Sequence, residues 1–81
     1  MVKVNLWGSL KSVASGRDSI DVEASTIRQM FRALGEQEPG LVPILDSGIT
    51  VAIDGQIYRD DWFKEVDDDS EVYLLPKMEG G

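Results

Sequence analysis

The feature that most constrains this fold is a single amphipathic helix pattern set between segments that alternate like strands. Four apolar residues recur at the i, i+3, i+4 and i+7 spacing of one helix face: Ile27, Met30, Phe31 and Leu34. Arg28 and Arg32 fall on the other side of the same helix. A helix with one apolar stripe needs one apolar surface to cover, so the remaining segments should supply a single sheet face.

Local signals mark both ends of this helix. Thr26 and Gln29 fit a capping box, in which the Thr oxygen accepts the Gln amide N–H and the Gln side chain reaches back. Gly35 lies near the end, and Pro39-Gly40 prevents the helix from continuing. The apolar run 41–45 that follows predicts either an irregular turn or a second short helix.

Two alternating segments precede the helix. Residues 2–7 and 19–23 each place apolar side chains at every second position, as half-buried strands do. Because they are close in sequence, we expect them to pair as a hairpin. The polar and small residues 9–18 between them predict a loop.

The strand pattern resumes after the helix. Residues 49–53 and 56–58 flank Asp54-Gly55, a strong signal for a two-residue hairpin turn, and residues 72–75 form a last strand. Between them, we expect Trp62 or Phe63 to plug the core. These elements predict an α+β fold with one main helix across a sheet of four or five strands.

Composition excludes several classes of function. The chain has 81 residues, no cysteine and no histidine, which rules out a disulfide scaffold, a Cys/His zinc site, a thiol nucleophile and a Ser-His-Asp triad. Its net charge of −7 disfavours nucleic acid and favours a basic protein surface. The triple aspartate 67–69 lacks the ligand spacing of a calcium loop, so we expect a solvated turn and no metal.

Two features bear on location. No apolar run approaches the roughly 20 residues that a membrane span requires. The first residues enter a strand pattern at once, which argues against a signal peptide. We therefore expect a cytoplasmic protein that contacts no membrane.

Four segments and the closing glycines together resemble a known family. They are Val-Asn-Leu-Trp-Gly at 4–8, Thr-Ile-Arg-Gln-Met at 26–30, Val-Ala-Ile-Asp-Gly at 51–55, and the strand at 69–76 that leads to Gly80-Gly81. In order and spacing they are similar to the MoaD/ThiS sulfur carriers, which share the ubiquitin-like β-grasp fold. The length and the aromatic residue in the first strand resemble the MoaD branch, the small subunit of molybdopterin synthase.

The resemblance implies a mechanism centred on the end of the chain. Residues 1–76 would form the β-grasp domain, and residues 77–81 a flexible tail ending in Gly80 and Gly81. An E1-like, MoeB-like enzyme would use ATP to adenylate Gly81, and a sulfur donor would convert it to a thiocarboxylate. A MoaE-like large subunit of molybdopterin synthase would then receive the sulfur. The carrier itself would bind no cofactor and would not be catalytic alone.

Other readings of the Gly-Gly end stay open. The chain could be a ubiquitin-like modifier joined to lysines, a carrier for thiamine synthesis or tRNA thiolation, or an interaction module with an inert tail. In each of these alternatives except the inert module, a partner must bind the domain while it modifies the tail. We expect Trp7, Leu75 and Met78 to form an apolar docking patch, with Tyr58 and Arg59 at its rim.

Overall fold

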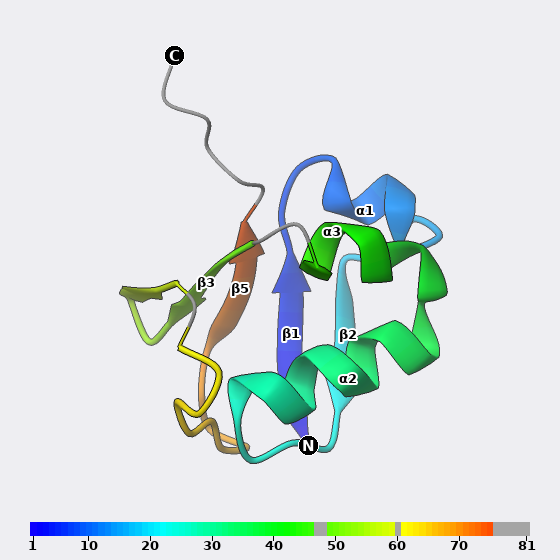
Figure 1. Cartoon of the computed structure of the whole chain (residues 1–81). Helices are drawn as coiled ribbons and strands as arrows, with labels where there is room; N and C mark the ends of the chain where they lie inside the picture. Colours follow the sequence, from blue (N-terminus) through cyan, green and yellow to red (C-terminus); the bar gives the residue numbers. More distant parts are fainter. Residues whose placement is uncertain (47–48, 60, 76–81) are drawn as a thin grey trace.

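A mixed sheet forms one layer of the molecule, and one main helix lies across it (Figure 1). The structure is a computed structural model that describes residues 1–46, 49–59 and 61–75. In these residues the strands are β1 (Val2–Leu6), β2 (Ser19–Val22), β3 (Thr50–Ile53), β4 (Gln56–Tyr58) and β5 (Val72–Leu75). The helices are α1 (Leu10–Val13), α2 (Ile27–Gln37), the 3-10 turn η1 (Pro39–Leu41) and α3 (Val42–Asp46).

The strands lie in the order β2-β1-β5-β3-β4. β1 and β2 pair antiparallel, with Val4 opposite Ile20, which confirms the predicted hairpin. β1 and β5 pair parallel, with Leu6 beside Leu74, so the first and last strands meet in the middle of the sheet. β3 runs antiparallel to both β5 and β4. This mixed sheet with one main helix across it is the predicted α+β, β-grasp arrangement.

The core lies between the sheet and the helices. Every second residue of β1, β2 and β5 faces it, because side chains alternate along a strand. The fully buried large side chains are Val2, Val4, Leu10, Ile20, Val22, Met30, Leu34, Leu41, Val51, Val72 and Leu74. Three of the four residues of the predicted helix stripe are buried, and Phe31 is partly buried against this core. The helix period therefore predicted the buried face correctly.

Both helix-end signals operate as expected. Thr26 Oγ1 accepts a hydrogen bond of 3.2 Å from the backbone N–H of Gln29, and Gln29 Oε1 accepts one of 2.8 Å from the backbone N–H of Ser25. These bonds satisfy N–H groups that have no partner within the helix. The helix ends at Gln37, two residues before Pro39.

The predicted loop at 9–18 is wrong in part, because it contains the short helix α1. Leu10 and Ala14 are four residues apart, and both are buried, so one turn of helix brings them onto the core together. Ser15 and Gly16 then adopt positive φ angles of 58° and 81°, which reverse the chain toward β2. The small and polar residues around Leu10 hid this single buried turn from the sequence pattern.

The segment after α2 adopts the helical alternative of the two predicted for it. Leu41 and Leu45 are buried, and η1 packs against α1 and α2. At Gly40 a Cβ atom would lie 3.0 Å from the carbonyl oxygen of Val13, so this glycine permits the close approach of η1 to α1.

The prediction that Trp62 or Phe63 plugs the core is wrong. Trp62 is 39% exposed and Phe63 is 75% exposed, whereas Val66 is buried in the core. The reason lies in the backbone: the carbonyls of Trp62 and Lys64 accept hydrogen bonds from the first N–H groups of α2, at Arg28 (2.9 Å) and Ile27 (3.0 Å). These bonds hold the segment beside the helix and leave both aromatic rings at the surface.

Candidate functional site

The face of the sheet opposite the core carries an apolar surface near the end of β5. Strand alternation places Trp7, Ala52, Ile57, Tyr73 and Leu75 on this side, and we call these five residues the open face. The register aligns Ala52 with both Tyr73 and Ile57, so these three form a row across β5, β3 and β4. The open face thus spans the strand from which the chain continues toward Gly81.

Trp7 and Leu75 lie side by side at the end of this face. β1 pairs in parallel with β5 through Leu6 and Leu74, and the backbone N–H of Trp7 continues the ladder with a bond of 3.2 Å to the carbonyl of Leu74. Trp7 is 56% exposed, as the parity of the first strand predicted, and Leu75 is half-buried. The structure therefore brings together the two described members of the predicted docking patch.

Three open-face residues, Ala52, Ile57 and Tyr73, were missed by the sequence reasoning. Ile57 is 55% exposed and Tyr73 is 38% exposed. The signal that could have found Ile57 is the two-residue turn Asp54-Gly55, because it fixes Ile53 opposite Gln56 and so aligns Ile57 with Ala52. Tyr73 could have been found from its alternation with the buried Val72 and Leu74.

The hydroxyl of Tyr73 is tied to its own strand. It donates a hydrogen bond of 3.1 Å to Glu71 Oε1. This bond, together with the negative charge of the carboxylate, raises the pKa of Tyr73 above its usual range. The phenol therefore stays neutral throughout the physiological pH range.

Of the predicted rim residues, Tyr58 is the last residue of β4 and Arg59 follows the end of that strand. Tyr58 is aligned with the buried Val51, which places it on the core side, where it is partly buried. Its hydroxyl donates to Gln56 Oε1 at 2.9 Å, and Lys64 Nζ lies 5.2 Å from the centre of its ring. Arg59 is exposed. Tyr58 therefore lies on the side of the sheet opposite Trp7.

The remaining predicted site residues, Met78, Gly80 and Gly81, lie outside the described residues. Leu75 is the last residue that the structure describes, and it belongs to a strand with partners on both sides. The chain therefore continues toward the predicted reactive carboxylate from a rigid point next to Trp7.

The family model that matches this sequence is that of the ThiS family, over residues 4–81. The chain belongs to the ThiS family. This places it among the ubiquitin-like ThiS/MoaD sulfur carriers, as the four sequence segments predicted. No curated protein matches the chain in sequence at a significant level.

Solved structures confirm the fold of this ThiS-family chain. A chain of the Amycolatopsis orientalis BexX/CysO complex superposes with a TM-score of 0.81 at 19% identity, covering 100% of both chains. The small archaeal modifier protein 1 of Methanosarcina acetivorans gives 0.80 at 21% identity, covering 99% of this chain and 95% of that one. A putative molybdopterin converting factor subunit 1 from Pyrococcus furiosus gives 0.78 at 18% identity, covering 95% and 97%. At these identities the likeness concerns the fold.

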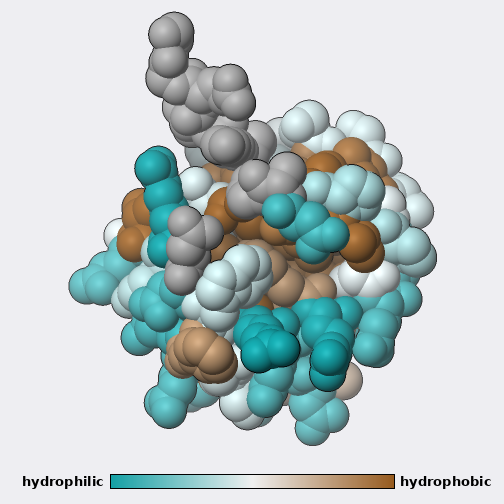
Figure 2. All heavy atoms as spheres, viewed as in Figure 1, coloured by the Kyte–Doolittle hydropathy of each residue, from teal (hydrophilic) through white to brown (hydrophobic). Residues whose placement is uncertain are grey.

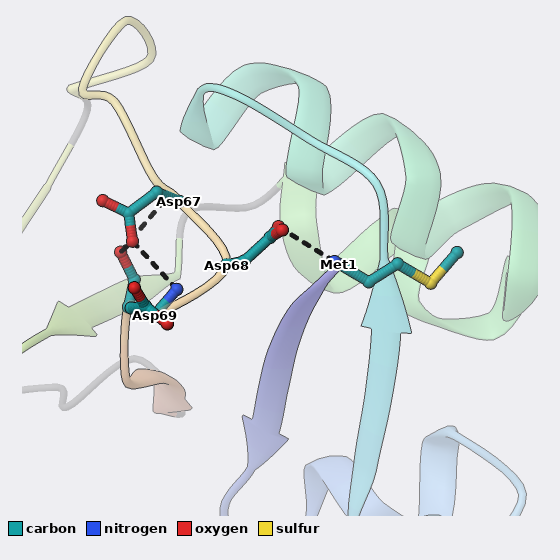
Figure 3. A network of polar contacts seen from close by, with 5 residues as sticks. Met1, Asp67, Asp68 and Asp69 are labelled. Carbon is teal, nitrogen blue, oxygen red and sulfur yellow. Dashed lines mark hydrogen bonds and ion pairs between the residues drawn. The ribbon is translucent and has the colours of Figure 1, made fainter.

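The acidic turn of this ThiS-family chain uses its carboxylates for local structure (Figure 3). Asp67 Oδ1 accepts hydrogen bonds from the backbone N–H of Asp69 (3.0 Å) and from the hydroxyl of Ser70 (3.2 Å). Asp68 Oδ1 lies 2.9 Å from the amino group of Met1, and this hydrogen bond raises the pKa of that amine.

Within the described ranges, no group of three or more acidic residues is arranged to hold a metal ion. Nor does any helix in that part of the chain have the length and apolar character to cross a membrane.

Proposed function

We propose that this chain is a cytoplasmic sulfur carrier for molybdopterin synthesis, with the carboxylate of Gly81 as its reactive group. The observation that carries the proposal is the open face, where Trp7 and Leu75 lie together at the point from which residues 76–81 continue. Membership of the ThiS family and the fold shared with a putative molybdopterin converting factor support it.

The chemistry follows from the properties of a terminal carboxylate. Its pKa of about 3.3–3.7 makes it an anion and a poor electrophile at neutral pH, so it must be activated. A carboxylate oxygen attacks the α-phosphorus of ATP on an E1-like partner, pyrophosphate leaves, and an acyl adenylate forms. A sulfur nucleophile then attacks the carbonyl carbon and AMP leaves. Sulfide yields the thiocarboxylate directly, whereas a persulfide yields an acyl disulfide, whose S–S bond a thiol then reduces to release the thiocarboxylate. The sulfur comes from outside, because this chain has no cysteine.

The tail suits this task on two counts. Gly80 and Gly81 have no side chains, so the carboxylate can enter a narrow active site without a Cβ atom in the way. Residues 77–81 reach at most about 17 Å when extended, at about 3.3–3.6 Å per residue. The partner can therefore hold the domain by the open face while its own catalytic groups act on Gly81.

We further propose two partners that bind the open face in turn. An E1-like, MoeB-like enzyme charges the tail, and a MoaE-like large subunit of molybdopterin synthase discharges it. The Amycolatopsis orientalis structure with the same fold is itself a complex of two proteins. An exposed aromatic anchor beside a half-buried leucine is the kind of surface on which a few residues provide most of the binding energy.

Mass spectrometry of the protein isolated from its host tests the proposal directly. The expected result is a population heavier by the replacement of one oxygen with one sulfur at Gly81. Adducts on lysines of other proteins would instead identify a ubiquitin-like modifier, and an unmodified terminus under all growth conditions would contradict both. Identification of the sulfur acceptor then requires assays with molybdopterin, thiamine and tRNA precursors in parallel.

A matched pair of variants tests the docking role. Trp7→Ala should weaken binding to the adenylating enzyme by at least tenfold, which corresponds to about 1.4 kcal/mol. Trp62→Ala removes an exposed tryptophan from the other side of the sheet and should leave that affinity unchanged. Removal of residues 80 and 81 should abolish charging while thermal unfolding stays the same. Equal effects of the two tryptophan variants would refute the role of the open face.

A further inference from the structure

A second exposed surface, on the helix side of the molecule, combines aromatic and basic side chains. Figure 2 views this side and shows hydrophobic side chains beside strongly hydrophilic ones. Phe63 is 75% exposed and Trp62 is 39% exposed, and the ring of Trp62 meets Phe31 edge-on, with 5.4 Å between the ring centres. The residue of this segment that packs into the core is Val66. Clustered aromatic side chains at the surface, rimmed by polar residues, are typical of interaction sites.

Two arginines of α2 lie beside these rings. One hollow of about 350 Å³ is lined by Arg28, Trp62 and Phe63. A second hollow, of about 300 Å³, is lined by Thr26, Arg28, Gln29, Arg32 and Phe63. Because the two hollows share Arg28 and Phe63, they adjoin, and we call the residues that line them the arginine–aromatic patch.

The charged residues of this patch are all positive. Arg28 and Arg32 are exposed, and neither forms an ion pair in the part of the chain that the structure describes. Among the described residues, Glu36, Asp46 and Asp61 line neighbouring hollows and not these two. Arg32 also borders the hollow with Glu36 and Asp46, so the positive charge is centred on Arg28. The patch is thus locally positive on a molecule whose net charge is −7.

The first N–H groups of α2, beside the patch, are already bonded. Those of residues 27–29 donate hydrogen bonds of 2.9–3.2 Å to two carbonyls of the 62–64 segment and to Thr26 Oγ1. Such groups are the ones through which the start of a helix commonly binds an anion. Recognition of a negative group here therefore falls to the two guanidinium groups, whose paired N–H donors match a carboxylate.

We propose that the arginine–aromatic patch binds an extended acidic peptide segment of a partner protein, with the pattern apolar-x-acidic-x-acidic. Arg28 and Arg32 are four residues apart, which is about 6 Å along a helix. In an extended peptide, residues i and i+2 point to the same side and lie about 6.6 Å apart, so their carboxylates can face the two guanidinium groups. An apolar side chain two positions further along then reaches the hollow between Trp62 and Phe63.

Charge complementarity favours a short peptide over a longer polyanion. A peptide of this pattern places its two negative charges only at the arginines. A nucleic-acid strand would carry further phosphates past the patch, over a surface that includes Glu36, Asp46 and Asp61. At 0.15 M ionic strength the Debye length is about 8 Å, so acidic residues beyond that distance repel the peptide only weakly. We expect a dissociation constant on the order of 100 µM, because exposed ion pairs contribute little.

This inference goes beyond the sulfur-carrier proposal and does not depend on it. The patch lies on the helix side of the sheet and contains no open-face residue. A partner bound through an acidic segment therefore leaves Trp7 and Leu75 free for a second protein. The carrier could thus be held by one partner while another acts on its tail.

NMR titration of the isotope-labelled full chain with the capped peptide Phe-Ser-Asp-Ser-Asp tests the proposal. The expected result is a saturable shift of the backbone amide signals at residues 26–32 and 61–64, with those of residues 2–7 and 72–75 unchanged. The peptide with both aspartates replaced by asparagine should bind about tenfold more weakly, because it loses two exposed ion pairs. The peptide with alanine in place of phenylalanine should bind about fivefold more weakly.

Two double variants of equal charge test the arginines. Arg28→Gln/Arg32→Gln should weaken peptide binding about tenfold. Lys3→Gln/Lys11→Gln removes two positive charges elsewhere on the surface and should change the affinity by less than about twofold. All four side chains are exposed, and circular dichroism checks that both variants are folded.

Three results would overturn the proposal. They are no saturable shift up to about 5 mM peptide, shifts centred on the open face, and equal weakening by the two double variants. A short oligouridine that shifts the same signals and binds more tightly than the peptide would assign the patch to single-stranded RNA, and would equally refute a peptide as the occupant.

Discussion

Replacement of Gly35 by alanine has two opposing effects of similar size on the free energy of unfolding. Alanine in a helix interior is favoured over glycine by about 1 kcal/mol. The added Cβ atom, however, would lie 2.9 Å from Cγ2 of Val42, well inside the optimum carbon–carbon separation of about 3.5–4.0 Å. Overpacking costs about 1–3 kcal/mol, and Val42 is 40% exposed, so it can yield and keep the cost near the lower end. Gly35→Ala alone should therefore lie between neutral and about 1 kcal/mol destabilising.

Removal of the obstructing methyl group separates the two effects. In a Val42→Ala background the contact is absent, and Gly35→Ala should stabilise the fold by about 1 kcal/mol. The coupling free energy between the two sites should then be about 1–2 kcal/mol. Urea unfolding followed by circular dichroism measures all four proteins. The pair Glu36→Ala and Glu36→Gly, at an exposed helix position, calibrates the propensity difference. An equal effect of Gly35→Ala in both backgrounds would refute the steric argument.

Three further changes probe the turn, the cap and the tyrosine. Gly55 has φ +85° with open space around it, so Gly55→Ala should cost about 1–2 kcal/mol from backbone strain alone, and Gly55→Asn less, in urea unfolding. Thr26→Ala should cost about 1 kcal/mol because the Gln29 N–H loses its acceptor, whereas Thr26→Ser should retain most of the stability. Because the pKa of Tyr73 is raised in the folded state, its contribution to stability is present below about pH 10 and is lost as the pH rises through the folded-state pKa. Glu71→Ala should lower that pKa in a tyrosinate absorbance titration, and an unchanged titration would contradict the assigned cause.

The local elements of this fold could be predicted from sequence because their signals are local. The helix period and the capping pair at Thr26 and Gln29 predicted α2 and its buried stripe. The alternation of the first strand predicted that Trp7 leaves the core side. The Asp54-Gly55 turn adopts positive φ at both residues, as its composition indicates. Each of these follows from residues within a few positions of one another.

The features that escaped prediction depend on residues far apart in the chain. The parallel pairing of β1 with β5 joins Leu6 to Leu74, and strand patterns contain nothing that selects it; only the family resemblance implied it. Trp62 is exposed because its backbone carbonyl accepts a hydrogen bond from the start of α2. The hydropathy of the side chains does not predict this backbone bond. Of the open face, only Trp7 and Leu75 were predicted, although the alternation of β5 and the two-residue turn also place Tyr73 and Ile57 there.

The central position of β5 has a mechanical consequence. This strand is hydrogen-bonded on one side to β1 and on the other to β3. Hydrogen bonds in a sheet lie across the strand direction. A force that pulls the chain end into an enzyme channel acts along the strand axis. It therefore loads the hydrogen bonds to β1 and to β3 together, in shear, and does not break them one at a time. The folded domain can therefore resist unfolding while a partner pulls on its C-terminal end.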